Sequence, residues 1–217
     1  MQIKINPAVT EETDKIKILA VSDSHGSSRT LEAILNRFGS MCSVLCFCGD
    51  GIEDLLSLLE QAEHDQELMT CIPKTIYIVR GNGDESSYRY SSEILNVPMD
   101  MSFKLCGMNV YMTHGHEYDV YYGMDYLYDA SIVHSASLVL FGHTHIANVQ
   151  TRYGITLLNP GSCARPRGGM PHTFAIVSLD KQSKKIDYNY YEMKAGKDRS
   201  IIFNLFNPPV GELNLLW

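Results

Sequence analysis

The sequence lacks a long hydrophobic run and an excess of positive charge. No segment approaches the roughly 20 apolar residues of a membrane-spanning helix, and the N-terminal residues 1–7 have no signal-peptide core. The formal net charge is −7, which argues against an extended nucleic-acid surface and against a nuclease that grips its substrate broadly. We therefore expect a soluble, cytoplasmic protein that does not bind membranes.

Paired cysteine motifs are absent as well. The chain has six cysteines, but it has none of the repeated CxxC pairs that bind structural zinc. Cys46 and Cys48 lie two residues apart on a predicted strand, which is too short a loop for an ordinary disulfide. We therefore predict buried free thiols and a reducing compartment.

The chain does contain a regular alternation of apolar strand patterns and helical patterns between residues 15 and 145. Apolar spacing predicts one helix that begins after Ser27 or Ser28 and ends at Gly39, and a second helix over residues 53–62. Predicted strands cover residues 16–22, 44–48, 75–79, 109–112 and 138–141. This alternation favours a mostly parallel sheet that is covered by helices.

After residue 145 the pattern changes to that of antiparallel hairpins. Strand patterns joined by short turns lie at residues 146–151, 155–158, 173–178 and 185–193. Together the two halves predict an α/β fold of two mixed sheets flanked by helices, a four-layer α-β-β-α sandwich. We expect an N-terminal arm over residues 1–14, one domain over 15–194, and an apolar tail over 195–217 that either docks on the domain or joins a homo-oligomer.

Metal-binding side chains follow each of the five strands predicted in the first part of the chain. In open α/β sheets the ligand lies beyond the carboxyl ends of the strands, so these side chains should meet at one edge. In chain order they are Asp23 and His25, Asp50, Asn82, His114 and His116, and His143 and His145. Mixed nitrogen and oxygen donors suit manganese, iron, zinc, nickel or cobalt. So many donors suit two ions that share a bridging carboxylate.

Asn82-Gly83 also has an ordinary interpretation, because this pair is a strong signal for a hairpin turn. A single Asp or Asn after a strand is likewise most often a cap or turn residue. However, residues 85–89 are polar and irregular, and no alternating strand is predicted to follow. The residues alone leave the role of Asn82 open between a turn and a ligand.

The series DxH, GD, GN, H and GHxH, in this order on strand ends, resembles the calcineurin-like metallophosphoesterases. The short chain, the segment Asn159–Ser162 after GHTH and the loop Pro166–Gly169 look like the small YfcE-type phosphodiesterase subgroup. The resemblance implies the four-layer fold and a metal-dependent phosphoric ester hydrolase. It also implies two divalent ions, with manganese first and nickel, zinc, iron or cobalt as alternatives.

By this resemblance, Asp50 bridges the two ions and the other six ligands divide between them. One ion is held by Asp23, His25 and His145, and the other by Asn82, His114 and His143. A hydroxide that bridges the ions would attack the phosphorus of a small phosphodiester in line. Asp50 and Asn82 would be the catalytic residues, so the resemblance favours a ligand over a turn at Asn82.

Three further residues are candidates for substrate contact: His116, Arg165 and Arg167. The arginines could clamp a phosphate, although surface arginines without such a role are equally common. Many family members carry His after the GN pair, and the YfcE-type subgroup carries Cys, where this chain has Gly83. Glycine cannot protonate a leaving group, so His116, His172 or a water are the alternative proton donors, and the natural substrate stays open.

A non-catalytic scaffold or binding subunit is the second interpretation, because the retromer subunit with this fold resembles the family and is chiefly a binding module. Such a role predicts eroded metal ligands, whereas all seven are present here. The apolar tail is the one feature that favours a partner surface. Five tyrosines between residues 118 and 128 fit the packing of a helix on the sheet better than stacking on a substrate.

Overall fold

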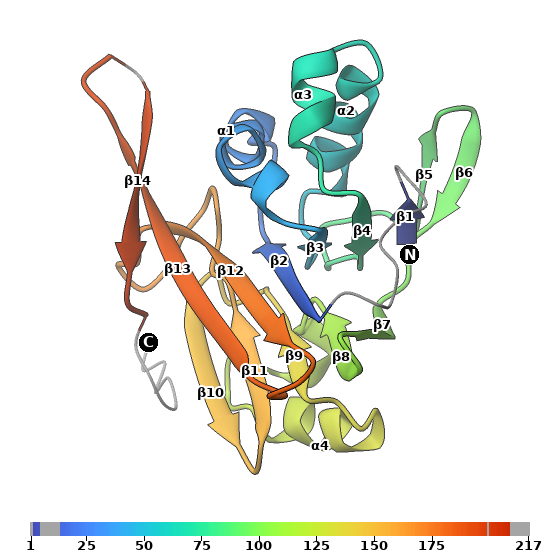
Figure 1. Cartoon of the computed structure of the whole chain (residues 1–217), viewed down its shortest axis with the longest axis vertical. Coiled ribbons are helices and arrows are strands. Elements are labelled where there is room, and N and C mark those ends of the chain that lie inside the picture. The colour runs from blue at the N-terminus through green and yellow to red at the C-terminus, as the bar shows by residue number, and fades with distance from the viewer. Residues whose placement is uncertain (1, 5–13, 199, 209–217) are drawn as a thin grey trace.

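Two packed β-sheets form the centre of the computed structural model, and helices cover both outer faces (Figure 1). The structure describes residues 2–4, 14–198 and 200–208. Three hydrophobic clusters fill the spaces between the layers, one between the sheets and one under the helices on each side. The predicted α/β sandwich of mixed sheets flanked by helices is therefore confirmed.

The first sheet has seven strands in the order β1-β4-β3-β2-β12-β13-β14. Its members are β1 (Gln2–Lys4), β2 (Lys15–Val21), β3 (Val44–Phe47), β4 (Thr75–Ile78), β12 (His172–Asp180), β13 (Ile186–Ala195) and β14 (Ile201–Phe206). The strands β2, β3 and β4 run parallel, and β12 and β13 continue the sheet in the antiparallel sense. Alternate residues of β2 face opposite layers, so Leu19 packs with the helices and Ile18 packs between the sheets.

The second sheet has five strands in the order β10-β11-β9-β8-β7. Its members are β7 (Asp100–Leu105), β8 (Met108–Thr113), β9 (Leu138–Leu140), β10 (Asn148–Arg152) and β11 (Ile155–Asn159). The central strands β8, β9 and β11 run parallel, and β7 and β10 lie antiparallel at the two edges. A separate hairpin of β5 (Ser87–Tyr90) and β6 (Glu93–Asn96) follows β4 along the chain.

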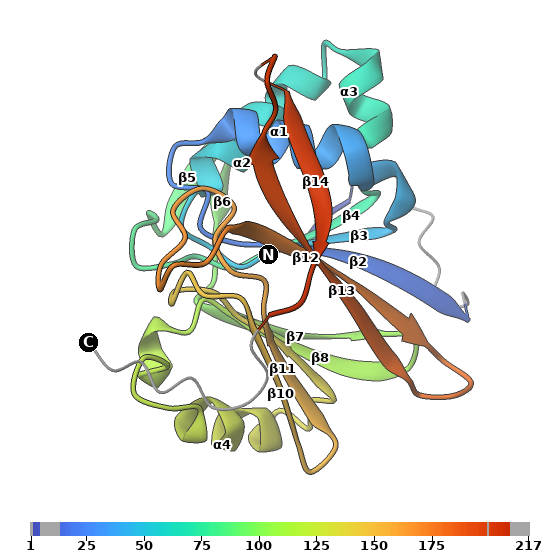
Figure 2. The same ribbon diagram turned by 90° about the vertical axis from the view of Figure 1, so that its left-hand side faces the viewer.

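Three helices cover the first sheet and one covers the second (Figures 1 and 2). They are α1 (Ser28–Phe38), α2 (Ile52–Ala62), α3 (Gln66–Cys71) and α4 (Asp125–Val133), with 3-10 turns at Gly39–Met41 and His116–Tyr118. The helix α1 begins after Ser27 and ends at Gly39, as predicted. Gly39 has a φ of −62° and is required for close packing, because a Cβ there would lie 1.8 Å from the carbonyl oxygen of Cys71.

The expectation that no alternating strand follows Asn82-Gly83, where residues 85–89 are polar, is wrong. The strand β5 begins within this segment and pairs with β6, and the turn between them is Ser91–Ser92, where both residues have positive φ. Asn82-Gly83 is therefore not the turn of this hairpin. Tyr88 and Leu95 pack partly buried against the hydrophobic cluster under the helices, so the burial of alternate side chains outweighs the polar composition of the segment.

Parts of the predicted arm and tail join the first sheet. The strand β1 pairs with β4, and β14 pairs with β13. The ring of Phe203 on β14 lies 5.1 Å from that of Phe38 and 5.9 Å from that of Phe174. Residues 209–217, the rest of the predicted tail, lie outside the described residues. Among the helices of the described ranges, none has the length and apolar character needed to span a bilayer.

Candidate metal centre

The predicted ligands lie on loops that follow β2, β3 and β4 of the first sheet and β8 and β9 of the second. Five of them have positive φ angles: Asp23 (58°), His25 (43°), Asp50 (57°), His143 (68°) and His145 (61°). Positive φ is uncommon outside glycine, although Asp and His are enriched among the exceptions. Such backbone strain clusters at functional sites. The positive φ angles therefore indicate the same loops as the sequence motifs do.

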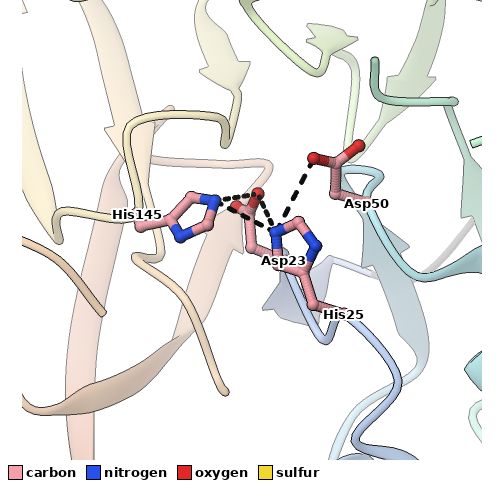
Figure 3. A group of neighbouring side chains, drawn as sticks. All are labelled: Asp23, His25, Asp50 and His145. Atoms are coloured by element: carbon pink, nitrogen blue, oxygen red, sulfur yellow. Dashed lines mark hydrogen bonds and ion pairs between the residues drawn. The ribbon is translucent and has the colours of Figure 1, made fainter. Parts of the chain in front are cut away.

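Four of these side chains converge in one cluster (Figure 3). Asp23, His25, Asp50 and His145 each offer one ligand atom, and these atoms lie within 4.8 Å of one another. His145 Nε2 lies 3.2 Å from Asp23 Oδ1 and 3.1 Å from His25 Nε2. His25 Nε2 in turn lies 3.7 Å from Asp23 Oδ1 and 3.7 Å from Asp50 Oδ2. Asp50 thus lies at the border of the cluster, where a bridging ligand would have to lie.

Backbone carbonyls orient two buried histidines of the site. His145 Nδ1 lies 2.6 Å from the carbonyl oxygen of Arg165, and His114 Nδ1 lies 2.7 Å from that of Cys48. Because a carbonyl oxygen can only accept, each Nδ1 carries the donated proton, and the Nε2 of each ring faces the carboxylates of the site. His114 Nε2 lies 3.5 Å from a carboxylate oxygen of Asp50. The fifth predicted ligand is therefore placed beside the four-residue cluster.

The buried atoms of the cluster fit a metal ion. Asp23 Oδ1 and His114 Nε2 are both buried and have no hydrogen-bond partner among the described residues. His145 Nε2 lies 3.2 Å from Asp23 Oδ1, which is close enough for one ion to bind both atoms. A divalent ion of the kind that mixed imidazole and carboxylate ligands prefer would satisfy all of these atoms.

The two carboxylates of the site are held in their ionised form. Burial alone would raise the pKa of Asp23, but its interactions with His145 and His25 outweigh burial, and its pKa lies well below the usual range. Burial likewise opposes ionisation of Asp50, but His114 and the Gly83 N–H lower its pKa. Metal ligands must be deprotonated, so both groups are ready to bind a cation.

The pKa values of two histidines shift in opposite directions. Burial would lower the pKa of His114, but Asp50 and Asp23 outweigh burial and raise it. Burial and the charge of His114 lower the pKa of His143 to about 4. His143 is therefore neutral at physiological pH, which is the form of imidazole that binds metals.

His143 lies next to His114 and is linked to one of the predicted substrate residues. The ring centroids of the two histidines are 5.1 Å apart, and the backbone N–H of His143 donates to Asp23 Oδ2. The hydroxyl of Tyr121 donates to the carbonyl oxygen of His143 at 2.8 Å. The guanidinium of Arg167 donates to that hydroxyl. Tyr121, which the sequence had assigned to helix packing, thus connects Arg167 to the site.

Asn82 lies on a loop that runs against the carboxylate of Asp50. The Gly83 N–H donates to Asp50 Oδ1 at 2.7 Å. A Cβ at Gly81 would lie 2.0 Å from the same oxygen, so only glycine allows the loop to approach this closely. The side chain of Asn82 is exposed. The structure therefore places both neighbours of Asn82 in the chain beside the Asp50 carboxylate.

The remaining candidate residues lie at the rim. The ring of His116 is partly buried and its centroid lies 5.4 Å from that of His114, and burial and the charge of His114 lower its pKa. Arg165 has an exposed side chain and contributes its backbone carbonyl to the site. His172 begins β12, where its Nδ1 lies 3.3 Å from the carbonyl oxygen of Cys163.

Two polar residues outside the predicted set of site residues hold the ligand loops in place by hydrogen bonds. Ser162 Oγ donates to the carbonyl oxygen of Asp23 at 2.7 Å, and Asn159 Nδ2 donates to that of Gly142 at 2.6 Å. Both belong to the Asn159–Ser162 segment that carries part of the family resemblance. Their partners are 139 and 17 residues away in the chain, so no local spacing could have indicated these contacts.

Residues 16–182 match the family model of the calcineurin-like phosphoesterase superfamily domain. The match covers most of the chain, and the protein belongs to this family. It is 25% identical over 175 residues to the probable metallophosphoesterase YsnB of Bacillus subtilis, a match that covers 80% of this chain and 90% of the relative. It is 26% identical over 173 residues to the phosphodiesterase YfcE of Escherichia coli, with 76% and 89% covered. These relatives support the assignment of the chain to the YfcE-type subgroup.

Solved structures share the fold. An uncharacterized predicted phosphoesterase from Streptococcus pneumoniae superposes with a TM-score of 0.62 at 24% identity, over 89% of this chain and 98% of that one. Vps29 of Entamoeba histolytica, complexed with zinc, superposes with a TM-score of 0.61 at 18% identity, over 88% and 98%. At these identities the likeness shows the fold, and function has to be argued from the site.

Proposed function

We propose that this protein is a phosphodiesterase that uses two divalent metal ions. The family and the names of its relatives support a metal-dependent phosphoric ester hydrolase. The observation that carries the proposal is the pair of buried, unpartnered ligand atoms Asp23 Oδ1 and His114 Nε2. They belong to different halves of the predicted ligand set, and a site for two ions accounts for both.

Each ion would have three ligands of its own and share Asp50. One would be held by Asp23, His25 and His145, and the other by Asn82, His114 and His143. When bound, the two ions would lower the pKa of a water molecule and neutralise charge on the phosphoryl oxygens. We propose manganese as the first metal to test, with nickel, zinc, iron and cobalt as alternatives.

The chain's own residues would orient the phosphate and the ligands. The carbonyl contacts of His114 and His145 fix both rings before substrate arrives. Asn82, whose side chain is exposed, would be accessible to incoming substrate, and Arg167, held by Tyr121, would supply a cation beside His143. The formal net charge of −7 offers no extended cationic surface, so we propose a small phosphodiester as the substrate.

Gly83 restricts the range of leaving groups. It lies beside the Asp50 carboxylate, where many family members carry a side chain that protonates the leaving oxygen. Without that proton donor, the leaving group must depart as an anion or take a proton from water. We propose that esters of acidic alcohols and phenols are cleaved fastest.

Hydrolysis of bis(p-nitrophenyl) phosphate, compared with p-nitrophenyl phosphate, tests the proposal. We expect a chelated sample to be inactive and manganese to restore cleavage of the diester. Asp50→Asn should lower kcat more than about 100-fold, because even outer partners of metal ligands commonly contribute 10- to 100-fold. Asp65→Asn is the matched control, since Asp65 caps α3. An absence of turnover with every metal, despite two bound ions, would contradict the proposal.

A binding subunit is the second candidate, because apolar side chains are exposed around α4. Tyr122, Val133 and Tyr153 are 86%, 81% and 85% exposed, and the solved structures of similar fold include Vps29. A binding subunit would retain the fold and bind metal without metal-dependent turnover. Substitution of these three residues by serine would then disrupt its complexes and leave the diesterase assay unchanged.

The cytoplasm is the compartment that we propose for this protein. All six cysteines are free in the described structure, which is typical of a reducing environment. Exclusive recovery of the protein from an oxidising compartment on cell fractionation would refute this location.

A further inference from the structure

The carboxylate of Asp84 accepts from backbone N–H groups of two segments of the chain, residues 50–52 and residue 81. Its Oδ2 accepts from the N–H of Asp50 at 2.6 Å and of Gly81 at 2.9 Å. Its Oδ1 accepts from the N–H of Gly51 at 2.9 Å and of Ile52 at 3.0 Å. One side chain thus joins the loop that carries Asp50, the loop that carries Asn82 and the first residues of α2.

The helix α2 depends on this contact for its N-terminal cap. Its own capping position is Gly51, which has a φ of 140° and no side chain to accept from the helix N–H groups. Asp84 supplies that acceptor from 32 residues further along the chain. A carboxylate is favoured at a helix N-terminus, where the free N–H groups carry partial positive charge.

We propose that Asp84 is a positioning residue that fixes Asp50 and Asn82 at the separation required by the second metal ion. The inference rests on the proposed two-metal function. Asp50 is held at both ends, since its N–H donates to Asp84 and its carboxylate accepts from the Gly83 N–H. Gly81, which also donates to Asp84, begins the same loop. Asp84 therefore sets the distance between the bridging carboxylate and the loop that presents Asn82.

The requirement is for a carboxylate in particular. Four backbone N–H groups donate to the two oxygens, the Tyr88 hydroxyl donates to Oδ1 at 3.4 Å, and an ionised Asp accepts at about four lone-pair positions. Asparagine has the same shape, but its amide nitrogen is a donor and would face two backbone N–H groups. Asp84→Asn therefore loses at least two of the four backbone hydrogen bonds and replaces two attractive contacts by repulsive ones.

Metal titration of the chelated protein by calorimetry tests this role without relying on activity. We expect the wild-type protein to bind two manganese ions. Asp84→Asn should bind the second ion about 10- to 100-fold more weakly, the usual effect of an outer partner of a metal ligand. The affinity for the first ion should fall by less, because that ion shares Asp50 but keeps Asp23, His25 and His145. The absorption spectrum of the cobalt-loaded protein should change most for the second ion, because two of its ligands are displaced.

Asp65→Asn is the matched control for a general loss of helix capping. Asp65 accepts from the N–H groups of Glu67 and Leu68 at the start of α3. It should leave both metal affinities unchanged. Asp84→Ser retains a capping hydroxyl and carries the same test if Asp84→Asn fails to fold.

The outcomes separate the two proposals. If the wild-type protein does not bind two ions, the proposed function fails and the inference fails with it. If the wild-type protein binds two ions and the folded Asp84 variants do so with the same affinities and the same cobalt spectrum, only the positioning role is overturned. If Asp65→Asn lowers the affinity for both ions, the loss is a general effect of reduced stability, and the positioning role of Asp84 is refuted as well.

Discussion

Replacement of Gly83 by histidine should give the site the proton donor that it lacks. Gly83 does not have a positive φ, so a side chain there brings no left-handed backbone strain. A Cβ at this position would lie 3.2 to 3.5 Å from the carboxylate atoms of Asp50, so the neighbours have to move by only a few tenths of an ångström. The new imidazole would start beside the Asp50 carboxylate, which is the proposed bridging ligand.

The size of the effect should depend on the leaving group. A positioned general acid contributes about 10²- to 10⁴-fold when the leaving group needs a proton, and a 100-fold gain corresponds to about 2.7 kcal/mol of barrier. The p-nitrophenolate anion leaves readily without a proton, so bis(p-nitrophenyl) phosphate should gain little. Diphenyl phosphate should gain about 100-fold, because phenolate is a far poorer leaving group.

A series of aryl phosphodiesters measures this prediction directly. The dependence of log kcat on the pKa of the leaving phenol should be steep in the wild-type protein and shallow in Gly83→His. Gly83→Ala adds the Cβ without a proton donor and should keep the steep dependence. The reasoning is refuted if Gly83→His, with its metal content unchanged, retains the steep dependence, or if Gly83→Ala flattens it equally.

Three further predictions concern thiols, pH and the C-terminal segment. In an Ellman titration of the native protein, Cys71 alone should react fast, because the other five cysteines are buried. Burial also raises the pKa of the Cys42 thiol to about 12. A second fast-reacting thiol would contradict this prediction. The stability of the metal-free protein should be greatest near pH 6.5, the ordinary pKa of histidine. Below that pH, His143, whose pKa is lowered to about 4, takes up a proton first in the unfolded chain. Above it, His114, whose pKa is raised, loses its proton first in the unfolded chain, so stability falls in both directions. Urea denaturation of His143→Gln should show a flatter acid limb, and an unchanged limb would refute the assignment. We propose that the tail joins a homo-oligomer. Removal of residues 196–217 should then lower the mass found by light scattering to that of a monomer, and because it deletes Phe203 it should also cost about 2 kcal/mol of stability. An unchanged mass would refute the tail interface.

The first half of the fold could be predicted because its strands are buried on both faces. Every residue of β3 and β4 is buried, so the apolar runs stand out in the sequence. The strand β7 was missed because it is an edge strand with alternating exposed residues, such as Ser102 and Lys104 among apolar neighbours. The helix α3 was missed because it has six residues and buries only Leu68, which is too short for a helical period to be visible.

The convergence of the ligands could be predicted because parallel strands present their carboxyl ends at one edge. The contacts that support the ligands could not. Asp84 meets Asp50 across 34 residues, and Arg167 meets Tyr121 across 46. Each contact depends on where the backbone of a distant loop lies after the two sheets have packed, and local patterns carry no information about that distance.

The ligands lie on loops of both sheets, so bound ions would act as a cross-link between the two layers. Asp23, His25 and Asp50 follow strands of the first sheet, whereas His114 and His145 follow strands of the second. An ion that binds only the folded state adds about 1.4 kcal/mol of stability for each tenfold excess of free metal over its Kd. The stability of the packing between the two sheets would then depend on the supply of metal as well as on the apolar core. In a metal-poor cell the same chain would open more often between the two sheets and be degraded faster, so the amount of protein would follow the supply of metal.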